Sequence, residues 1–153
     1  MNRKDREIEK QSEIIFIIQR ATVCRLGIFG EEYPYIVPLC FGYEDNTLYF
    51  HSANKGMKLD LLKKNPKVCF EMDMGEEVKT LSKTCDWGMR YQSIVGFGES
   101  EFLESDEEKR HGLDVIVRHY APDAASSDYT DTVLKHTAVF RVHIRSMSGK
   151  KSE

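Results

Sequence analysis

A cluster of polar and charged residues between positions 51 and 58 has the composition of an anion-binding site. It contains a histidine, a serine, an asparagine and two lysines, namely His51, Ser52, Asn54, Lys55 and Lys58. Loop backbone N–H groups, together with hydroxyl, amide and ammonium groups, are the donors that bind phosphate in proteins. We therefore predict an anion site here, with phosphate as the favoured ligand.

Two strands and a short helix are expected to position this cluster. Residues 35–43 and 47–51 are rich in β-forming side chains and are separated by a turn. A helix is expected over residues 55–64 because an Asn-Pro pair ending at Pro66 terminates it. This places Lys58 in the first helical turn, where the backbone N–H groups are also free to bind an anion.

Pro38 interrupts the first of these strands. Proline cannot donate a ladder hydrogen bond, so it is confined to edge strands, to bulges or to unpaired stretches. Two interpretations follow and the sequence does not separate them. Pro38 either lies on an ordinary edge strand or marks a place where a ligand approaches the backbone.

The rest of the chain adds strands more often than helices. Further strands are expected over residues 23–29, 67–74, 91–103 and 136–145, and helices over residues 5–20 and from Ser105 onward. The polar segment 75–88 is expected to form a loop or an excursion from the barrel. About six strands, joined mostly by short turns, favour an antiparallel barrel with flanking helices over a parallel sheet.

Length and composition indicate a soluble globular protein rather than a nucleic-acid or membrane protein. The chain has 153 residues and a net charge of −3, whereas an electrostatic nucleic-acid binder would carry a basic surface. No apolar run approaches the roughly 20 residues of a membrane helix. The charged N-terminus does not resemble a signal peptide, so a cytoplasmic protein is expected.

The cysteines give no sign of a metal or redox motif. Four are present, and no two are spaced as a CxxC pair. Cys24, Cys40 and Cys69 lie in apolar, strand-like runs and are expected to be reduced residues of the core. No metal site is predicted.

Two long stretches resemble a known family. Residues 38–72 (PLCFGYEDNTLYFHSANKGMKLDLLKKNPKVCFEM) and 85–109 (CDWGMRYQSIVGFGESEFLESDEEK) are similar to the pyridoxamine 5′-phosphate oxidase-like flavin-binding split barrels, especially the branch related to 5-nitroimidazole resistance proteins. The likeness runs from about Ile14 to Gly149. It implies a single domain over residues 1–153, with a core of about 14–149, folded as a six-stranded antiparallel FMN-binding split barrel.

The resemblance also implies which residues contact the cofactor. By position, the candidates on the phosphate side are His51, Ser52, Lys55 and Lys58. The strand backbone that family members lay along the flavin ring corresponds to Val37, Pro38, Leu39 and Cys40. Met57 stands where members of the oxidase branch usually carry an arginine, so charge compensation is weaker here or comes from Lys55.

Several of these residues have two possible roles. His51 matches the histidine reported as catalytic in the nitroimidazole branch, or it only hydrogen-bonds the phosphate or the ribityl chain. Lys58 is a phosphate ligand or a solvated helix lysine. Trp87 covers the flavin or substrate of a partner chain or anchors a dimer interface. Arg90 is a clamp for a substrate carboxylate or an ordinary loop charge.

The function implied by the resemblance is that of an FMN-binding oxidoreductase, with FAD as a possible replacement for FMN. It would act as a homodimer with flavins at the interface and would reduce a nitro compound or another small oxidised acceptor. No GxGxxG motif follows a strand, so a reduced nicotinamide donor would bind only transiently against the flavin. No nucleic-acid or membrane partner is expected.

Two alternatives remain open. One is a haem-binding or haem-degrading split barrel, whose axial ligand would be one of His111, His119, His136 and His143. The other is a flavin-binding module without catalysis. Pyridoxamine phosphate oxidation itself is less favoured, because the basic residues near the C-terminus do not form a convincing second phosphate site.

Overall fold

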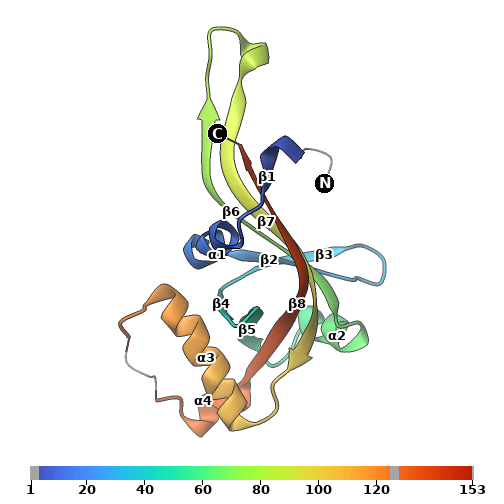
Figure 1. The fold of residues 1–153 in the computed structure, drawn as a ribbon. Coiled ribbons are helices and arrows are strands. Elements are labelled where there is room, and N and C mark those ends of the chain that lie inside the picture. Colours follow the sequence, from blue (N-terminus) through green and yellow to red (C-terminus); the bar gives the residue numbers. More distant parts are fainter. Residues whose placement is uncertain (1–3, 125–127, 153) are drawn as a thin grey trace.

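The structure, a computed structural model, describes residues 4–124 and 128–152 and is built on one antiparallel sheet (Figure 1). The strands are β1 (Glu7–Ile8), β2 (Cys24–Ile28), β3 (Tyr35–Leu39), β4 (Phe41–Glu44), β5 (Thr47–Ala53), β6 (Lys67–Lys79), β7 (Gly88–Phe102) and β8 (Thr137–Ser152). The helices are α1 (Gln11–Arg20), α2 (Met57–Lys64), α3 (Asp106–Tyr120) and α4 (Asp131–His136), with 3₁₀ turns η1 (Lys4–Arg6) and η2 (Thr84–Asp86). The predicted mainly β class is confirmed, with eight strands in place of six.

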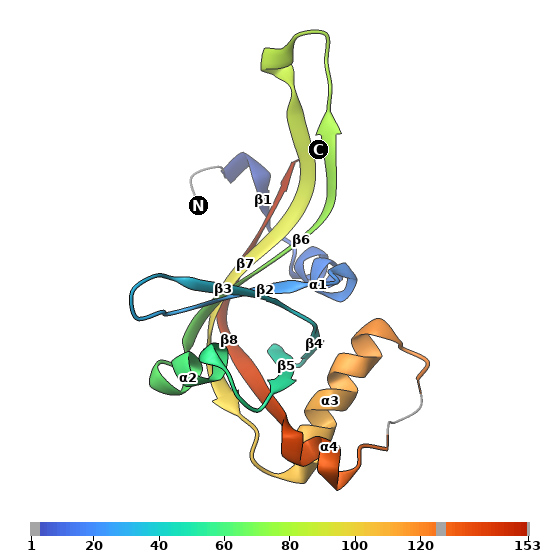
Figure 2. The same ribbon diagram turned by 180° about the vertical axis from the view of Figure 1, so that it is seen from behind.

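The sheet curls until its two ends meet. Its strand order is β3-β2-β6-β7-β8-β5-β4, and the short β1 pairs with β8. The end strands β3 and β4 are separated in the chain by Cys40 alone. The chain therefore steps from one edge of the sheet to the other at this residue, which closes a barrel without a ladder (Figure 2). We call this place, residues 39–41, the seam.

Pro38 lies on an edge strand, so that interpretation of the interrupted strand is confirmed. β3 stands at one end of the strand order and pairs only with β2, where Pro38 is opposite Arg25. The predicted single strand over residues 35–43 is wrong, because it divides at the seam into β3 and β4. The division supplies one of the two additional strands, and β1 is the other.

Two apolar clusters hold the fold together. The barrel interior and the inner face of α1 form the larger cluster, whose most buried members include Ile17, Ile18, Leu26, Phe41, Phe50, Phe70, Met72, Ile94 and Phe140. A satellite cluster lies between α3, α4 and the outer face of β5 and β8, and contains Tyr49, Leu103, Leu113, Val115, Ile116, Leu134 and Val139. Both faces of β5 are therefore covered, which explains its run of four buried residues, Thr47 to Phe50.

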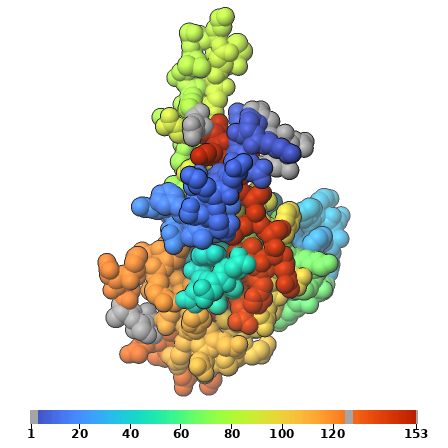
Figure 3. Space-filling view, viewed as in Figure 1, coloured from blue at the N-terminus to red at the C-terminus, as the bar shows by residue number. Residues whose placement is uncertain are grey.

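Of the two forms expected for residues 75–88, a loop or an excursion, the structure shows the excursion. β6 continues to Lys79 and β7 begins at Gly88, so the segment is the end of a long hairpin that projects from the body (Figure 3). Both faces of this segment are exposed because the hairpin leaves the body of the molecule, and most of its residues are polar. The ladder is interrupted only between Met74 and Glu77, where the register shifts.

Both ends of the chain also differ from the prediction. The helix expected over residues 5–20 begins at Gln11, because residues 4–8 form η1 and β1 instead. The last strand continues past position 145 to Ser152, since β7 supplies ladder partners up to that residue. No helix in the two described ranges is both long enough and apolar enough to cross a membrane.

Cys24 is buried as expected, but Cys40 and Cys69 are exposed, which corrects the prediction for these two. All four cysteines are free. Cys69 points to the outer face of β6, where its sulfur lies 2.5 Å from the position that a Cβ on Gly27 would occupy. Glycine on the neighbouring strand is therefore what makes room for this outward thiol.

Candidate functional site

The β4–β5 hairpin brings the two predicted halves of the site to one end of the barrel. Phe41 pairs with Phe50 in the antiparallel ladder. Cys40 precedes Phe41 and His51 follows Phe50, so these two residues lie opposite each other just beyond the β4–β5 pairing. The backbone segment 37–40 and the polar loop 51–58 are therefore neighbours, although the strand prediction did not include the break between β3 and β4.

His51 and Lys58 are close enough to influence each other electrostatically. Burial lowers the pKa of Lys58, which lies in the first turn of α2 with its side chain partly buried. The pKa of His51 is also lowered, first by burial and then by the positive charge of Lys58. Lys58 has no ion-pair partner within residues 4–124 and 128–152. The site therefore carries a partly desolvated cation whose counter-charge is missing.

The N-terminus of α2 adds backbone donors beside this cation. Gly56 precedes the helix with φ 132° and ψ 162°, a conformation that essentially only glycine adopts, and no side chain caps the helix. The N–H groups of Leu59 and Asp60 donate to the Gly56 carbonyl. For those of Met57 and Lys58 the described residues provide no acceptor. Nothing lies within 4 Å of the place where a Gly56 side chain would begin, so a ligand can approach the backbone.

The remaining loop residues are engaged to different degrees. The Ser52 hydroxyl donates to the Ala53 carbonyl at 2.8 Å, a bond that it would lose on turning toward a ligand. The Asn54 side chain donates to the Lys135 carbonyl at 3.2 Å and ties the loop to α4, which gives it a structural role. Lys55 is exposed and forms no ion pair in the described part of the chain.

The segment Val37 to Cys40 offers a backbone edge. Val37 and Leu39 pack against the barrel core, whereas Pro38 and Cys40 are exposed. Because β3 is a terminal strand, its second edge has no ladder partner among the described strands. N–H and C=O groups on that edge are available to the polar rim of a flat ligand.

Trp87 and Arg90 are not brought to this site within one chain. Trp87 lies at the tip of the β6–β7 hairpin, half-exposed, and its indole N–H donates to the Leu81 carbonyl at 2.9 Å. Figures 1 and 2 place this tip at the opposite end of the molecule from α2. Only a partner chain would bring Trp87 to the loop 51–58.

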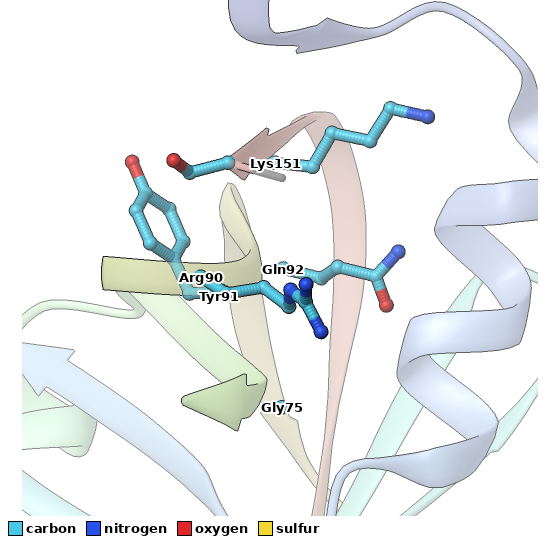
Figure 4. A pocket seen from close by; sticks show the side chains of 6 residues that line it. Gly75, Arg90, Tyr91, Gln92 and Lys151 are labelled. Carbon is cyan, nitrogen blue, oxygen red and sulfur yellow. The ribbon is translucent and has the colours of Figure 1, made fainter. Parts of the chain in front are cut away.

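Arg90 has the surroundings of a structural hairpin residue. Its guanidinium pairs with Glu77 across the hairpin at 3.1 Å. It borders an open cavity of about 440 Å³ at the hairpin base, shown in Figure 4, together with Gly75, Tyr91, Gln92, Lys151 and Ser152. The ion pair with Glu77 therefore occupies the Arg90 guanidinium that a substrate carboxylate would need.

The histidines proposed as haem ligands do not converge. His111 contacts the Glu44 carboxylate at 2.7 Å, and His143 contacts Glu101 at 2.8 Å. The third, His119, contacts the Ala21 carbonyl at 2.8 Å. His136 is exposed at the end of α4. Three of the four rings are thus engaged by the protein itself, and the described residues contain no cluster of three or more metal-binding side chains.

Two features at or near the site were missed in the sequence. Tyr120 reaches the seam from α3, where its hydroxyl accepts from the Phe41 N–H at 3.1 Å and donates to the Thr22 carbonyl at 2.9 Å. Tyr120 was not among the residues predicted for the site. The second feature is an exposed apolar groove on the outer face of the sheet, lined among others by Phe29, Ile36 and Phe97.

An antiparallel sheet that curls into a barrel and closes at a seam rather than through a ladder defines the split-barrel class. The chain belongs to the pyridoxamine 5′-phosphate oxidase family, whose family model matches residues 10–151. A candidate 5-nitroimidazole antibiotic resistance protein from Bacteroides thetaiotaomicron is 38% identical, with a TM-score of 0.83 over 96% of this chain and 90% of that one. This confirms the resemblance predicted from the sequence. Among curated proteins no match was found.

More distant solved structures share the fold. A flavocytochrome from Azotobacter vinelandii is 17% identical, with a TM-score of 0.85 over 96% of this chain and 69% of that one. An FAD- and haem-binding protein from Mycobacterium smegmatis is 19% identical, with a TM-score of 0.86 over 97% of this chain and 74% of that one. At these identities the likeness concerns the barrel and its flanking helices alone.

Proposed function

We propose that this protein is an FMN-binding oxidoreductase that uses a reduced nicotinamide to reduce a nitro compound or another small oxidised acceptor. The observation that carries the proposal is the partly buried cation Lys58, which lacks a counter-charge and lies beside the uncapped N-terminus of α2. The relatives support it, because one is a candidate nitroimidazole resistance protein and others bind flavin.

The residues present fit a ligand that ends in a phosphate. A phosphate would supply the negative charge that Lys58 lacks and would accept hydrogen bonds from the N–H groups of Met57 and Lys58. Gly56 leaves the backbone open on the approach side. His51, at the end of β5, completes the set of donors on that side.

FMN would supply the electron chemistry, and the protein would bind and orient it. Lys58 and the start of α2 would hold the phosphate, while the free edge of Val37 to Cys40 would hydrogen-bond the flat ring system. His51 is mainly neutral at neutral pH because its pKa is lowered by burial and by Lys58. A neutral imidazole has one N–H donor and one acceptor nitrogen, so His51 is suited to hold or move a proton at this site.

We further propose that two copies of the chain form the working unit. The outer face of β3, β2, β6 and β7 carries an apolar groove of about 580 Å³. The register places Ile36, Gly27, Cys69 and Phe97 in one row across these four strands. Phe29, Ile36 and Phe97 are 60%, 66% and 57% exposed, and apolar patches of this kind mark protein interfaces. A second copy would cover this face and bring a hairpin tip with Trp87 toward the first.

Turnover assays test the catalytic part of the proposal. Purified protein loaded with FMN is expected to oxidise a reduced nicotinamide faster when a nitroaromatic acceptor is added. Protein that binds flavin stoichiometrically but shows no such turnover with nitroaromatics, quinones or free flavin would be a binding module without catalysis. Protein that does not bind flavin would refute the whole proposal.

A further inference from the structure

We propose that His119 and Tyr120 are positioning residues that clamp the barrel seam and so keep the backbone of residues 37–40 in the shape that receives the flavin ring. This inference rests on the proposed function and extends it to a part of the fold that contacts no phosphate. The clamp is the C-terminal end of α3, which contacts the beginning of β4 and the segment just before β2, the ladder partner of β3.

The seam needs such a clamp because no ladder holds it. β3 and β4 stand at opposite ends of the strand order, and the described strands include no pairing between them. The backbone between Leu39 and Phe41 is therefore held by what packs or hydrogen-bonds there. Any rotation at Cys40 would move the free edge of β3, which is the edge proposed to meet the flavin ring.

The Tyr120 hydroxyl links β4 to the segment that leads into β2 through one oxygen atom. It accepts a hydrogen bond from the N–H of Phe41, the first residue of β4, at 3.1 Å. The same hydroxyl donates to the carbonyl of Thr22, just before β2, at 2.9 Å. β2 is the ladder partner of β3, so the link fixes β4 relative to the pair β2 and β3.

His119 supports the same two segments. Its ring nitrogen Nε2 donates to the carbonyl of Ala21 at 2.8 Å. The ring lies with its centroid 4.4 Å from that of Phe41, a side chain that is completely buried in the barrel. Two consecutive helix residues thus hold the entry to β2 and the beginning of β4 together.

The approach of α3 to β4 is itself built into the chain. A Cβ on Gly42 would lie 2.5 Å from the carbonyl oxygen of Val115, so only glycine allows the helix backbone to come this close. Removal of the Tyr120 hydroxyl from water raises its pKa to about 12. The hydroxyl therefore stays protonated, and keeps its role as a donor, at neutral pH.

Loss of the clamp should weaken flavin binding because fewer molecules would have the backbone of residues 37–40 in the conformation that binds the flavin ring. The apparent dissociation constant equals the intrinsic one divided by the fraction of molecules in the competent conformation. If release of the seam lowers that fraction to about one tenth, the dissociation constant of FMN rises about tenfold. The ring environment also changes, so the absorption spectrum of the bound flavin should shift.

The test compares Tyr120→Phe, which keeps the ring and removes the hydroxyl, with two control variants of the full-length protein. Arg118→Ala changes a residue on the same helix as Tyr120 and removes an exposed ion pair with Glu44 of β4. Leu134→Ala lowers the stability of the protein by removing a buried side chain from the satellite cluster. Tyr120→Phe is expected to raise the FMN dissociation constant about tenfold and to shift the bound-flavin spectrum. Both controls should bind FMN with wild-type affinity and spectrum, and His119→Gln, which retains a side-chain donor, should bind more tightly than His119→Ala.

Wild-type affinity and spectrum in Tyr120→Phe would overturn the inference while leaving the proposed function intact. An equal loss of affinity in Leu134→Ala would also overturn it, because the effect would then follow from stability alone. If the wild-type protein binds no flavin, both the proposed function and the clamp fail.

Discussion

Replacing Lys58 by glutamine should weaken FMN binding selectively through the phosphate. The structure shows a partly buried lysine whose pKa is lowered by burial and which has no ion-pair partner in the described residues. A hydrogen bond between charged groups contributes about 1.5–3 kcal/mol, and each 1.4 kcal/mol is a factor of ten in a dissociation constant. Because Lys58 is only partly buried, we expect a loss near the lower end, about tenfold in FMN affinity.

Riboflavin provides the sharpest comparison because it has the ring and the ribityl chain of FMN but no phosphate. Fluorescence titrations of wild-type protein and Lys58→Gln with both ligands should show the loss for FMN and none for riboflavin. Lys64→Gln is the matched control, since Lys64 lies on the same helix but is exposed and paired with Glu31. Equal losses for FMN and riboflavin, or an equal loss in Lys64→Gln, would refute the assignment of Lys58 to the phosphate.

Three further predictions follow from the same geometry. The lowered pKa of His51 means that the unfolded chain binds the His51 proton more readily than the folded chain. His51 should therefore reduce the stability of the protein as the pH falls below the ordinary histidine pKa near 6.5. His51→Gln should flatten a profile of melting temperature against pH between pH 7.5 and 5, and an unchanged profile would contradict the shift. Gly96→Ala should destabilise the protein by about 1–3 kcal/mol, because the new Cβ would lie 2.1 Å from the fully buried ring of Phe70; an unchanged midpoint in urea unfolding would show that the ring can move aside. Phe97→Glu places a charge in the apolar groove and should convert the proposed dimer to monomer in sedimentation experiments, whereas Glu107→Gln on the exposed start of α3 should not; a dimer that survives Phe97→Glu would place the interface elsewhere.

Much of the fold could be predicted because local patterns and tertiary structure agree. The helix over residues 55–64 carries Pro66 as a stop signal, and Ser105 begins α3 with a complete capping box. Only the structure shows that Val139 faces the satellite cluster, whereas Val142 and Ile144 on the same strand face the barrel interior.

The errors arose where surroundings outweigh local composition. The many polar side chains of segment 75–88 are typical of a loop, whereas the segment forms a hairpin because its two strands pair with each other. Cys69 was predicted to be buried because its strand is apolar on both faces. Such a strand does not reveal which face is exposed, and Cys69 lies on the exposed outer face of the sheet. The polar loop 51–58 was predicted as a cluster, and the pairing of β4 with β5 brings it close to Cys40. The break between β3 and β4 at Cys40 was not predicted, because sequence periodicity does not encode it.

The hydrogen bonds of Tyr120 could not be predicted from the sequence, because the partners of its hydroxyl lie 79 and 98 positions away in the chain. The role of Trp87 toward a partner chain stays a prediction from the sequence, and the residue lies at the tip of a projecting hairpin.

Native mass spectrometry of the purified protein tests the central claim most directly, because it reports the bound molecule and the number of chains together. We predict a dimer that carries two FMN molecules, whose mass distinguishes FMN from FAD and from haem. A spectrum of apoprotein that stays ligand-free after incubation with excess FMN would contradict the claim that this barrel is a flavin site.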